Sequence, residues 1–469
     1  MKIAYMHFHL KTGGVTTVIR QQVEALQGTC ETLVLAGGLP EGDFPCPVIV
    51  VPGIGYDTDS DQPSTPVATA QAVFQAIKGH WPGGCDVLHV HNPTLAKNKN
   101  YLKILKILKE KGIRLFLQIH DFAEDGRPGV YFHENYPADC HYGVINSRDY
   151  AILIKAGLTA TGLHLVSNMV TPLPVSPGPQ KSGSHILYPI RAIRRKNIGE
   201  AILLSIFFPG NKPLLLTQPP NSPADFPAYE SWKQFVTRQG LNIEFEAGQR
   251  ESFVTLVQDA ELLLTTSISE GFGFSFMEPW TAGKRLWGRD LPGITDDFKT
   301  SGIKLNHLYT RLRVPVKWTQ AGDFRKSWIV AVRSSTQAFQ LEIRERDILA
   351  GFERMTADGT LDFGLLNERH QQAVVATAIE STANKAMLVD LNPFLADCGR
   401  SAFTGEQTEN NRERVLEHYS QTAYRRLLEK RYTQISTTDP VQAIHKDLLL
   451  EKFFNLNNFS LLKWGLHDS

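Results

Sequence analysis

Short apolar runs alternate with helix-compatible segments along the first 170 or so residues of this 469-residue chain. The apolar runs have the length of buried strands, and the segments between them have helical periodicity. This alternation constrains the fold strongly, because parallel strands must be joined by crossovers that cover both faces of the sheet. It predicts a doubly wound α/β domain. The expected strands lie at 2–8, 32–36, 48–51, 86–90, 113–119, 142–146 and 164–167, and the expected helices at 15–26, 67–79, 96–111 and 148–156.

A second α/β pattern begins after residues 171–184, a segment rich in Pro, Gly and Ser that is typical of a linker. Strands are expected at 185–190 and 242–246, with helices at 198–208 and 250–258. Two domains also fit the length, since single cores rarely grow beyond roughly 250–300 residues. We therefore expect a first Rossmann-like domain at 1–172, a linker at 173–184, a second Rossmann-like domain with helical elaboration at 185–405, and terminal helices at 406–469.

The stretch from Ala260 to Gly288 contains the pattern most indicative of a ligand site. An apolar run ends at Ser267, and the turn Glu270-Gly271-Phe272-Gly273 then leads into a helix-compatible segment that carries Glu278. A strand, a glycine turn and a helix in this order place a helix N-terminus at the carboxyl edge of a sheet, where free N–H groups and the helix dipole favour an anion. The sequence therefore predicts a phosphate-binding turn.

The two glutamates of this stretch need a partner, because a carboxylate beside a phosphate is repelled unless it meets hydroxyls or positive charge. Sugars supply hydroxyls: Glu270, in the loop, could bind a sugar ring, and Glu278, about two turns into the helix, could hold a ribose. The alternative is that both are solvated glutamates at a helix start, where the dipole favours each by ~0.3–1 kcal/mol. Spacing alone does not separate the two interpretations.

Residues 269–283, SEGFGFSFMEPWTAG, resemble the Glu-x7-Glu signature of retaining nucleotide-sugar glycosyltransferases with the GT-B architecture, a family that includes glycogen, sucrose and lipopolysaccharide sugar transferases. The resemblance implies two Rossmann-like domains that face each other across a cleft, the first for the acceptor and the second for the nucleotide sugar. One segment departs from the family, because its usual Gly-x-Pro-Val is replaced by Gly283-Lys284-Arg285-Leu286. The matching residues are Ser267, Glu270, Gly271, Phe272, Gly273 and Glu278.

Two further motifs occur in the order that this family requires. Arg191 and Lys196 follow an expected strand with Arg-x4-Lys spacing, where cations would neutralise a diphosphate and the charge that develops as it leaves. A solvated basic loop is the plainer alternative, but the resemblance implies a diphosphate motif. Gly13 and Gly14 follow the first strand, and paired glycines let a backbone approach a ligand closely. The resemblance implies that this loop faces the donor diphosphate.

His120 directly follows an expected strand and should project at the carboxyl edge of the sheet, where open α/β sheets bind ligands. The resemblance implies an active-site histidine that contacts the transferred sugar; the alternative is that His120 only caps the strand. A polar loop follows it. The candidate acceptor contacts in this region are Asp121, Glu124, Asp125 and Arg127.

Composition excludes several other classes of protein. Lys+Arg 49 against Asp+Glu 48 gives a net charge of +1, which argues against a dedicated nucleic-acid binder. The five cysteines are scattered and lack CxxC spacing, so neither a disulfide framework nor a cysteine zinc site is indicated. The N-terminus runs directly into a strand and nowhere do ~18 apolar residues follow one another, so we expect a cytoplasmic protein without a signal peptide or membrane span.

The aspartates of residues 57–61, DTDSD, could ligate a divalent cation through oxygen. A calcium loop is excluded, because Gln62 stands where glycine is required and Ala68 where the bidentate glutamate is required. Arg191, Lys196 and the helix N-termini already supply positive charge to a diphosphate. We therefore expect metal-independent transfer, with no metal and no cofactor besides the nucleotide-sugar substrate.

Beyond residue 305 the periodicity favours helices, at 323–356 and 363–385, over further sheet. Residues 409–432 and 440–459 are amphipathic. In the GT-B family the last helices cross back onto the first domain, which is the expectation here. A membrane-surface helix is the alternative, although these segments lack a strongly basic face.

The pattern and the resemblance together predict a retaining hexosyltransferase that moves a hexose from a nucleoside-diphosphate sugar to a small-molecule, glycan or lipid-linked acceptor. His120, Arg191, Lys196 and Glu270 are the expected catalytic residues, and none is expected to act as a covalent nucleophile, since the leaving phosphate serves as the base in the family's usual mechanism. The alternatives are a GT-B-fold phosphorylase or sugar-nucleotide epimerase, and a catalytically silent sugar-binding or scaffold protein.

Overall fold

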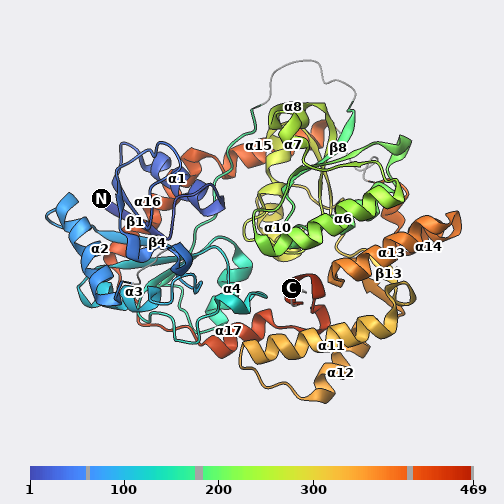
Figure 1. Cartoon of the computed structure of the whole chain (residues 1–469). Helices are drawn as coiled ribbons and strands as arrows, with labels where there is room; N and C mark the ends of the chain where they lie inside the picture. Colours follow the sequence, from blue (N-terminus) through green and yellow to red (C-terminus); the bar gives the residue numbers. More distant parts are fainter. Residues whose placement is uncertain (60–63, 175–182, 399–404, 466–469) are drawn as a thin grey trace. The chain divides into compact units, whose positions relative to one another are not determined.

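The computed structural model describes residues 1–59, 64–174, 183–398 and 405–465. The chain divides into two compact units (Figure 1). The first contains residues 1–169 and 419–454, and the second contains residues 170–418 and 455–469. A parallel sheet forms the centre of each unit. The predicted α/β fold with two Rossmann-like domains is therefore confirmed.

The first unit contains a seven-stranded parallel sheet with the strand order β3-β2-β1-β4-β5-β6-β7. The order reverses between β1 and β4, and open α/β sheets bind ligands at the carboxyl ends of the strands beside such a switch point. The strands are β1 (Lys2–His7), β2 (Glu31–Ala36), β3 (Val48–Val50), β4 (Val87–His91), β5 (Leu115–Ile119), β6 (His141–Val144) and β7 (Leu163–Leu165). The helices are α1 (Gly14–Leu26), α2 (Pro66–His80), α3 (Tyr101–Glu110), α4 (Ser147–Lys155), α16 (Gln421–Thr437) and α17 (Lys446–Phe453).

Helices cover both faces of this sheet, which explains why apolar residues occur on both faces of its strands instead of at alternate positions only. Ala4 and Met6 of β1 pack in the core that contains the buried side chains of α2 and α3. Ile3 and Tyr5 of the same strand point to the opposite face, where the core contains side chains of α1 and α16. The return of α16 to this unit therefore completes its second layer.

The second unit contains a five-stranded parallel sheet with the strand order β10-β9-β8-β11-β12. Its strands are β8 (His185–Arg191), β9 (Leu214–Gln218), β10 (Ile243–Glu244), β11 (Ala260–Thr265) and β12 (Arg285–Gly288). Its helices are α5 (Ile198–Ser205), α6 (Phe226–Gln239), α7 (Ala247–Arg250), α8 (Phe253–Asp259), α9 (Glu278–Thr281), α10 (Pro292–Thr300), α11 (Ala321–Ala338), α12 (Glu345–Thr356), α13 (Glu368–Glu380), α14 (Thr382–Leu391), α15 (Gly405–His418) and α18 (Leu461–Trp464).

Three expectations from the sequence need correction. Residues 406–469 do not all pack on the first unit, because 405–418 and 455–469 belong to the second. The region beyond 305 is not purely helical, since β13 (Arg313–Pro315) pairs with β14 (Thr360–Asp362) in an antiparallel ribbon. The sequence analysis also missed β9 and α6. Most of the predicted linker, 175–182, lies outside the described residues.

Within the described ranges, every helix is too short or too polar to cross a membrane.

Candidate functional site

The Glu270–Gly273 turn lies beyond the carboxyl end of β11, as the sequence predicts. Gly273 adopts a left-handed conformation, with φ of 92°, and a Cβ there would lie 2.9 Å from the Phe276 ring. Glycine is therefore required for the turn. Phe272 is 5% exposed and its ring packs against Phe274 and Phe298, so its side chain belongs to the core and only its backbone can face a ligand.

An ion pair lies at the centre of this edge of the sheet. Lys196, the last residue of the short 3-10 helix η4 (Arg194–Lys196), donates from Nζ to Oε1 of Glu270 at 2.5 Å. Both side chains are largely buried. Burial by itself would raise the pKa of Glu270, but the cations of Lys196 and Arg195 outweigh it and lower that pKa. Glu270 is therefore a charged carboxylate at neutral pH.

The backbone of Lys196 is fixed to the neighbouring strands. Its carbonyl oxygen accepts hydrogen bonds from Tyr188 Oη at 2.6 Å and from Thr266 Oγ1 at 3.1 Å. The loop after β11 is also tied to η4, because the Ile268 N–H donates to the carbonyl of Arg195. These bonds fix the backbone from which the Lys196 side chain extends, and the ion pair with Glu270 holds its ammonium group.

Glu278 lies half-buried close to this ion pair without being bonded to it. Burial raises the pKa of Glu278 to about 7, the proximity of Glu270 raises it further, and Lys196 opposes both effects. Within the described residues no side chain or backbone group hydrogen-bonds to the Glu278 carboxylate. The sequence analysis placed Glu278 two turns into a helix, which is wrong: it is the first residue of α9, followed by Pro279 at the helix start.

Arg191 is the last residue of β8, exposed at the carboxyl edge of the sheet. Its guanidinium makes no ion pair within the part of the chain that the structure describes. Arg195, which the sequence analysis did not nominate, influences Glu270 directly through its charge. The repeated cations in RAIRRKN were the signal that could have indicated it.

A buried ionic network lies around Arg289, in the loop after β12. Arg289 follows β12 and donates to both Oε atoms of Glu200 and both Oδ atoms of Asp362, at 2.6–2.8 Å. Tyr309 donates to Glu200 at 2.7 Å. Gly288 has φ of 133°, and a Cβ there would clash with the Thr265 carbonyl. The loop after β12, which the sequence left unassigned, therefore serves to anchor β11 and β12, and Arg289 is fully engaged within the protein.

In the first unit, Gly13 and Gly14 begin α1 at the carboxyl end of β1. The helix has no side-chain cap and no acidic residue in its first turn. A Cβ at Gly14 would meet no atom within 4 Å, and Gly13 has extended backbone angles that any residue can adopt. The fold of the unit therefore does not require either glycine, and a small residue at this position suits a ligand that approaches the backbone.

His120 follows β5 at the same edge and is 6% exposed. Asn92 Oδ1 accepts the backbone N–H groups of His120 and Asp121, and His120 Nε2 lies 2.8 Å from Nδ1 of His91. Burial lowers the pKa of His120 to about 4. The imidazole is therefore neutral at physiological pH.

The residues expected to contact the acceptor differ in burial and in their partners. Glu124 is fully buried, accepts a hydrogen bond from Tyr136 at 2.8 Å, and has its pKa raised by burial. It is a core residue, so its prediction as an accessible acceptor contact is wrong for this structure. Asp121 and Arg127 form an ion pair at 3.4 Å near the edge of the sheet. Asp125 is only half-buried in the same loop.

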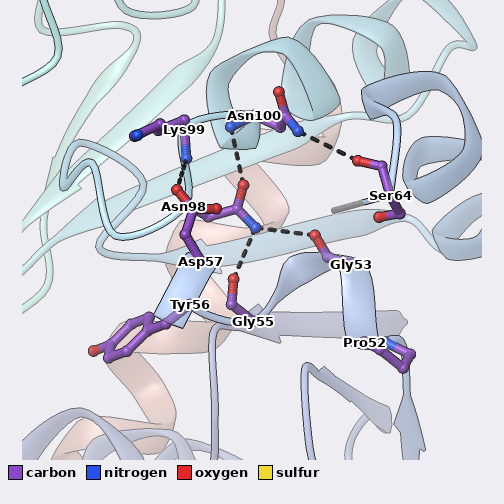
Figure 2. A pocket seen from close by; sticks show the side chains of 9 residues that line it. All are labelled: Pro52, Gly53, Gly55, Tyr56, Asp57, Ser64, Asn98, Lys99 and Asn100. Atoms are coloured by element: carbon purple, nitrogen blue, oxygen red, sulfur yellow. Dashed lines mark hydrogen bonds between the residues drawn. The ribbon is translucent and has the colours of Figure 1, made fainter. Parts of the chain in front are cut away.

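A pocket of about 380 Å³ opens beside this edge between the loops that follow β3 and β4 (Figure 2). The amide of Asn98 holds the two loops together by donating to the carbonyls of Gly53 and Gly55. The groups that line the cavity include the Tyr56 ring, the Asp57 carboxylate and the side chain of Lys99. These groups suit a polar, hydroxylated molecule.

Lys97 lies next to this pocket, with Nζ 5.5 Å from the centre of the Tyr56 ring. Burial and the nearby charge of Arg127 lower the pKa of Lys97. No carboxylate of the described residues lies within ion-pair distance of its ammonium group. Arg127 already pairs with Asp121, whereas burial of Lys97 near that arginine disfavours its charged form.

No group of three or more potential ligands among the described residues is arranged to hold a metal ion. Of the aspartates considered above, Asp57 accepts the backbone N–H of Lys99, and Asp61 lies outside the described residues.

No protein-family model matches the chain. It is 28% identical over 357 residues to mannosylglucosyl-3-phosphoglycerate synthase from Petrotoga mobilis, covering 66% of this chain and 68% of that protein. The resemblance to GT-B glycosyltransferases is confirmed by this relative and by the structures that the chain resembles.

Two of those structures cover nearly the whole chain. Sucrose-phosphate synthase from Thermosynechococcus elongatus matches with a TM-score of 0.52 at 14% identity, over 92% of this chain and 98% of that one. HepE from Anabaena, in complex with UDP and glucose, matches with a TM-score of 0.54 at 13% identity, over 92% and 99%. At these identities the matches show the fold.

Proposed function

We propose that this chain is a retaining glycosyltransferase that moves a hexose from a nucleoside-diphosphate sugar to an acceptor. The observation that carries the proposal is the arrangement at the edge of the second sheet. There the Lys196 ammonium group pairs with a charged carboxylate, Glu270, beside the half-buried carboxylate of Glu278, which makes no hydrogen bond to the described residues. The cation would bind the negatively charged diphosphate, and the carboxylates would accept hydrogen bonds from the sugar hydroxyls. The name of the Petrotoga relative supports the same activity.

Each residue has a proposed role. Arg191, Arg195 and Lys196 neutralise the diphosphate, most strongly when the glycosidic bond breaks and its charge grows. Glu278 is half-buried and accepts hydrogen bonds from the ribose hydroxyls. Glu270 binds the reacting hexose and stabilises the positive charge that develops on it. No side chain is assigned as a covalent nucleophile, and the departing phosphate takes the acceptor proton.

We further propose that the acceptor binds the first unit at the pocket of Figure 2 and carries an anionic group that Lys97 and Arg127 recognise. The pocket lies at the loops that follow β3 and β4, and Lys97 beside it has no carboxylate of the described residues within ion-pair distance, so an anionic group would suit it. The relative's name, which contains 3-phosphoglycerate, supports an anionic acceptor. The five cysteines are all free, which supports a reducing compartment such as the cytoplasm.

The activity is tested by measuring nucleotide release from UDP-, GDP- and ADP-hexoses in the presence of candidate acceptors, with UDP-glucose first because HepE binds it. The anomeric configuration of the product, read by NMR, distinguishes retention from inversion. Transfer only when inorganic phosphate replaces the acceptor would indicate a phosphorylase. Nucleotide-sugar binding without turnover by any acceptor would indicate the silent alternative.

The acceptor site has its own test, in which 3-phosphoglycerate is the calorimetric probe. Lys97→Met keeps the aliphatic stem and should weaken binding about tenfold or more, since a charge-assisted hydrogen bond contributes ~1.5–3 kcal/mol. Lys103→Met removes an exposed lysine of α3 that pairs with Glu134 and should leave binding unchanged. Equal effects of the two changes, or no binding to the unaltered protein, would contradict this location.

A further inference from the structure

A chain of buried histidines lies behind His120 in the first unit. His89 and His91 are successive inward-facing residues of β4 and stack at 4.3 Å, and His91 is bonded through Nδ1 to His120 Nε2. His89 and His91 are 0% exposed. The Tyr432 hydroxyl lies 2.8 Å from His89 Nδ1. The function proposed above gives His89 and His91 no role, so it does not explain why polar rings are buried at these positions.

Only one proton can lie between His91 Nδ1 and His120 Nε2. Burial lowers the pKa of both rings, so both are neutral and each carries its proton on one nitrogen alone. Either His91 donates from Nδ1, or His120 donates from Nε2. The choice fixes what the other nitrogen of His120 can do.

The environment of His91 decides between these arrangements. Its Nε2 is buried and has no hydrogen-bond partner among the described residues. If His120 were the donor, His91 would have to carry its proton on Nε2, which would leave a buried N–H without an acceptor. Orphaned buried N–H groups are rarer than buried acceptors that lack a donor. His91 therefore carries its proton on Nδ1 and donates it to His120.

We infer that His91 is a positioning residue that holds His120 in the Nδ1-protonated tautomer, so that His120 presents a hydrogen-bond donor to an oxygen of the substrate. Nδ1 of His120 makes no hydrogen bond to the described residues and is not buried away from solvent. In this tautomer that nitrogen has no lone pair available, so His120 binds an oxygen and does not remove a proton. The substrate contact rests on the proposed function, but the tautomer does not.

A second histidine pair in the same sheet provides a matched reference. His141 Nε2 lies 2.8 Å from the Thr438 carbonyl, so it must carry the proton there, and its Nδ1 must accept from His164 Nε2 at 3.0 Å. Geometry thus fixes this pair in the opposite tautomer. The pair lies at the amino end of β6, away from the carboxyl edge that holds His120.

The tautomer is read directly by long-range ¹H–¹⁵N NMR correlation on histidine-labelled full-length protein, with the signals of each ring assigned by its loss in a single variant. We expect a protonated Nδ1 and a bare Nε2 for both His120 and His91, against protonated Nε2 for His141 and His164. A protonated Nε2 on His120 overturns the inference. This readout needs no substrate, so it remains decisive even if the chain does not transfer glycosyl groups.

Three variants test the effect on turnover. His91→Phe keeps a ring but removes the donor, so the His120 ring loses the hydrogen bond that orients it. We expect kcat/KM to fall about five- to tenfold, the equivalent of roughly one hydrogen bond. His91→Asn returns an N–H near the position of Nδ1 and should recover kcat/KM to within about twofold. His164→Phe breaks a comparable buried bond and should leave both His120 and turnover unchanged. Equal losses in His91→Phe and His164→Phe would reduce His91 to a packing role and contradict the inference.

Discussion

Lys196 and Glu270 lie 74 positions apart in the sequence, yet Nζ of one donates to Oε1 of the other at 2.5 Å. The pair joins the loop after β8 to the loop after β11, two strands that are neighbours in the second sheet. Tyr188 and Thr266 fix the Lys196 backbone, and Glu270 holds its ammonium group at the carboxyl edge of the sheet. In the proposed reaction, this ammonium group would neutralise the negative charge of the departing diphosphate.

Lys196→Met should lower kcat/KM for the nucleotide sugar by about 10- to 100-fold, since a hydrogen bond to a charged group contributes ~1.5–3 kcal/mol. A control exists in the same unit: Lys212 pairs with Glu261 near the opposite end of β11. Lys212→Met should therefore change kcat/KM by less than about twofold. If steady-state kinetics showed similar losses for both variants, the effect would be one of stability and Lys196 would not belong to the site.

Glu278 should make the stability of the ligand-free protein depend on pH. Its pKa is raised from 4.5 to about 7 by burial, so the folded state holds its proton more tightly than the unfolded state. The stabilisation is present below pH ~4.5 and is lost as pH rises to about 7. At most, this shift corresponds to ~3 kcal/mol.

Glu278→Gln should consequently raise the melting temperature at pH 8 and change it little at pH 5. The same substitution should weaken nucleotide-sugar binding, because an amide presents a donor where a ribose hydroxyl needs an acceptor. Thermal denaturation across this pH range measures the first effect and calorimetry the second. A pH-independent difference in melting temperature would place the Glu278 carboxylate in solvent.

Transfer should proceed without a divalent cation, since Arg191, Arg195 and Lys196 supply positive charge at the diphosphate. The expected result is full activity in excess chelator. Two results together would contradict the cationic site and indicate a metal site. One is a loss of activity in chelator that added magnesium or manganese restores. The other is inactivity of a folded variant in which Asp57, Asp59 and Asp61 are changed to Asn.

Arg289 should matter for stability far more than an exposed arginine does. Arg289→Met leaves the carboxylates of Glu200 and Asp362 buried without a counter-charge, a loss that costs ~3–5 kcal/mol. Arg313 pairs with Asp358 at a comparable distance but in an exposed setting, so Arg313→Met should cost less than ~1 kcal/mol. Urea denaturation compares the two, and similar midpoints would mean that the buried network adds nothing.

Much of the second sheet could be read from local patterns, but not all of it. The apolar run of β11 and the turn after it lie where the sequence predicts them. β9 was missed, because a short apolar run cannot be distinguished from a buried helix segment by periodicity alone. The start of α9 was misplaced by about two turns, although Pro279 was a usable sign of a helix start at Glu278.

The sequence by itself determined the α/β class, the two sheets and the candidate residues Lys196, Glu270 and Glu278, because these depend on local periodicity and on short motifs. Only the tertiary structure decided which polar groups meet. It paired Lys196 with Glu270, buried Glu124 against Tyr136, and brought His91 to His120. The physical reason is that burial and pairing depend on contacts between segments far apart in the chain. The local sequence shows which ionisable and polar side chains are present. Packing determines which of them are charged, which are buried and which form a hydrogen bond or an ion pair.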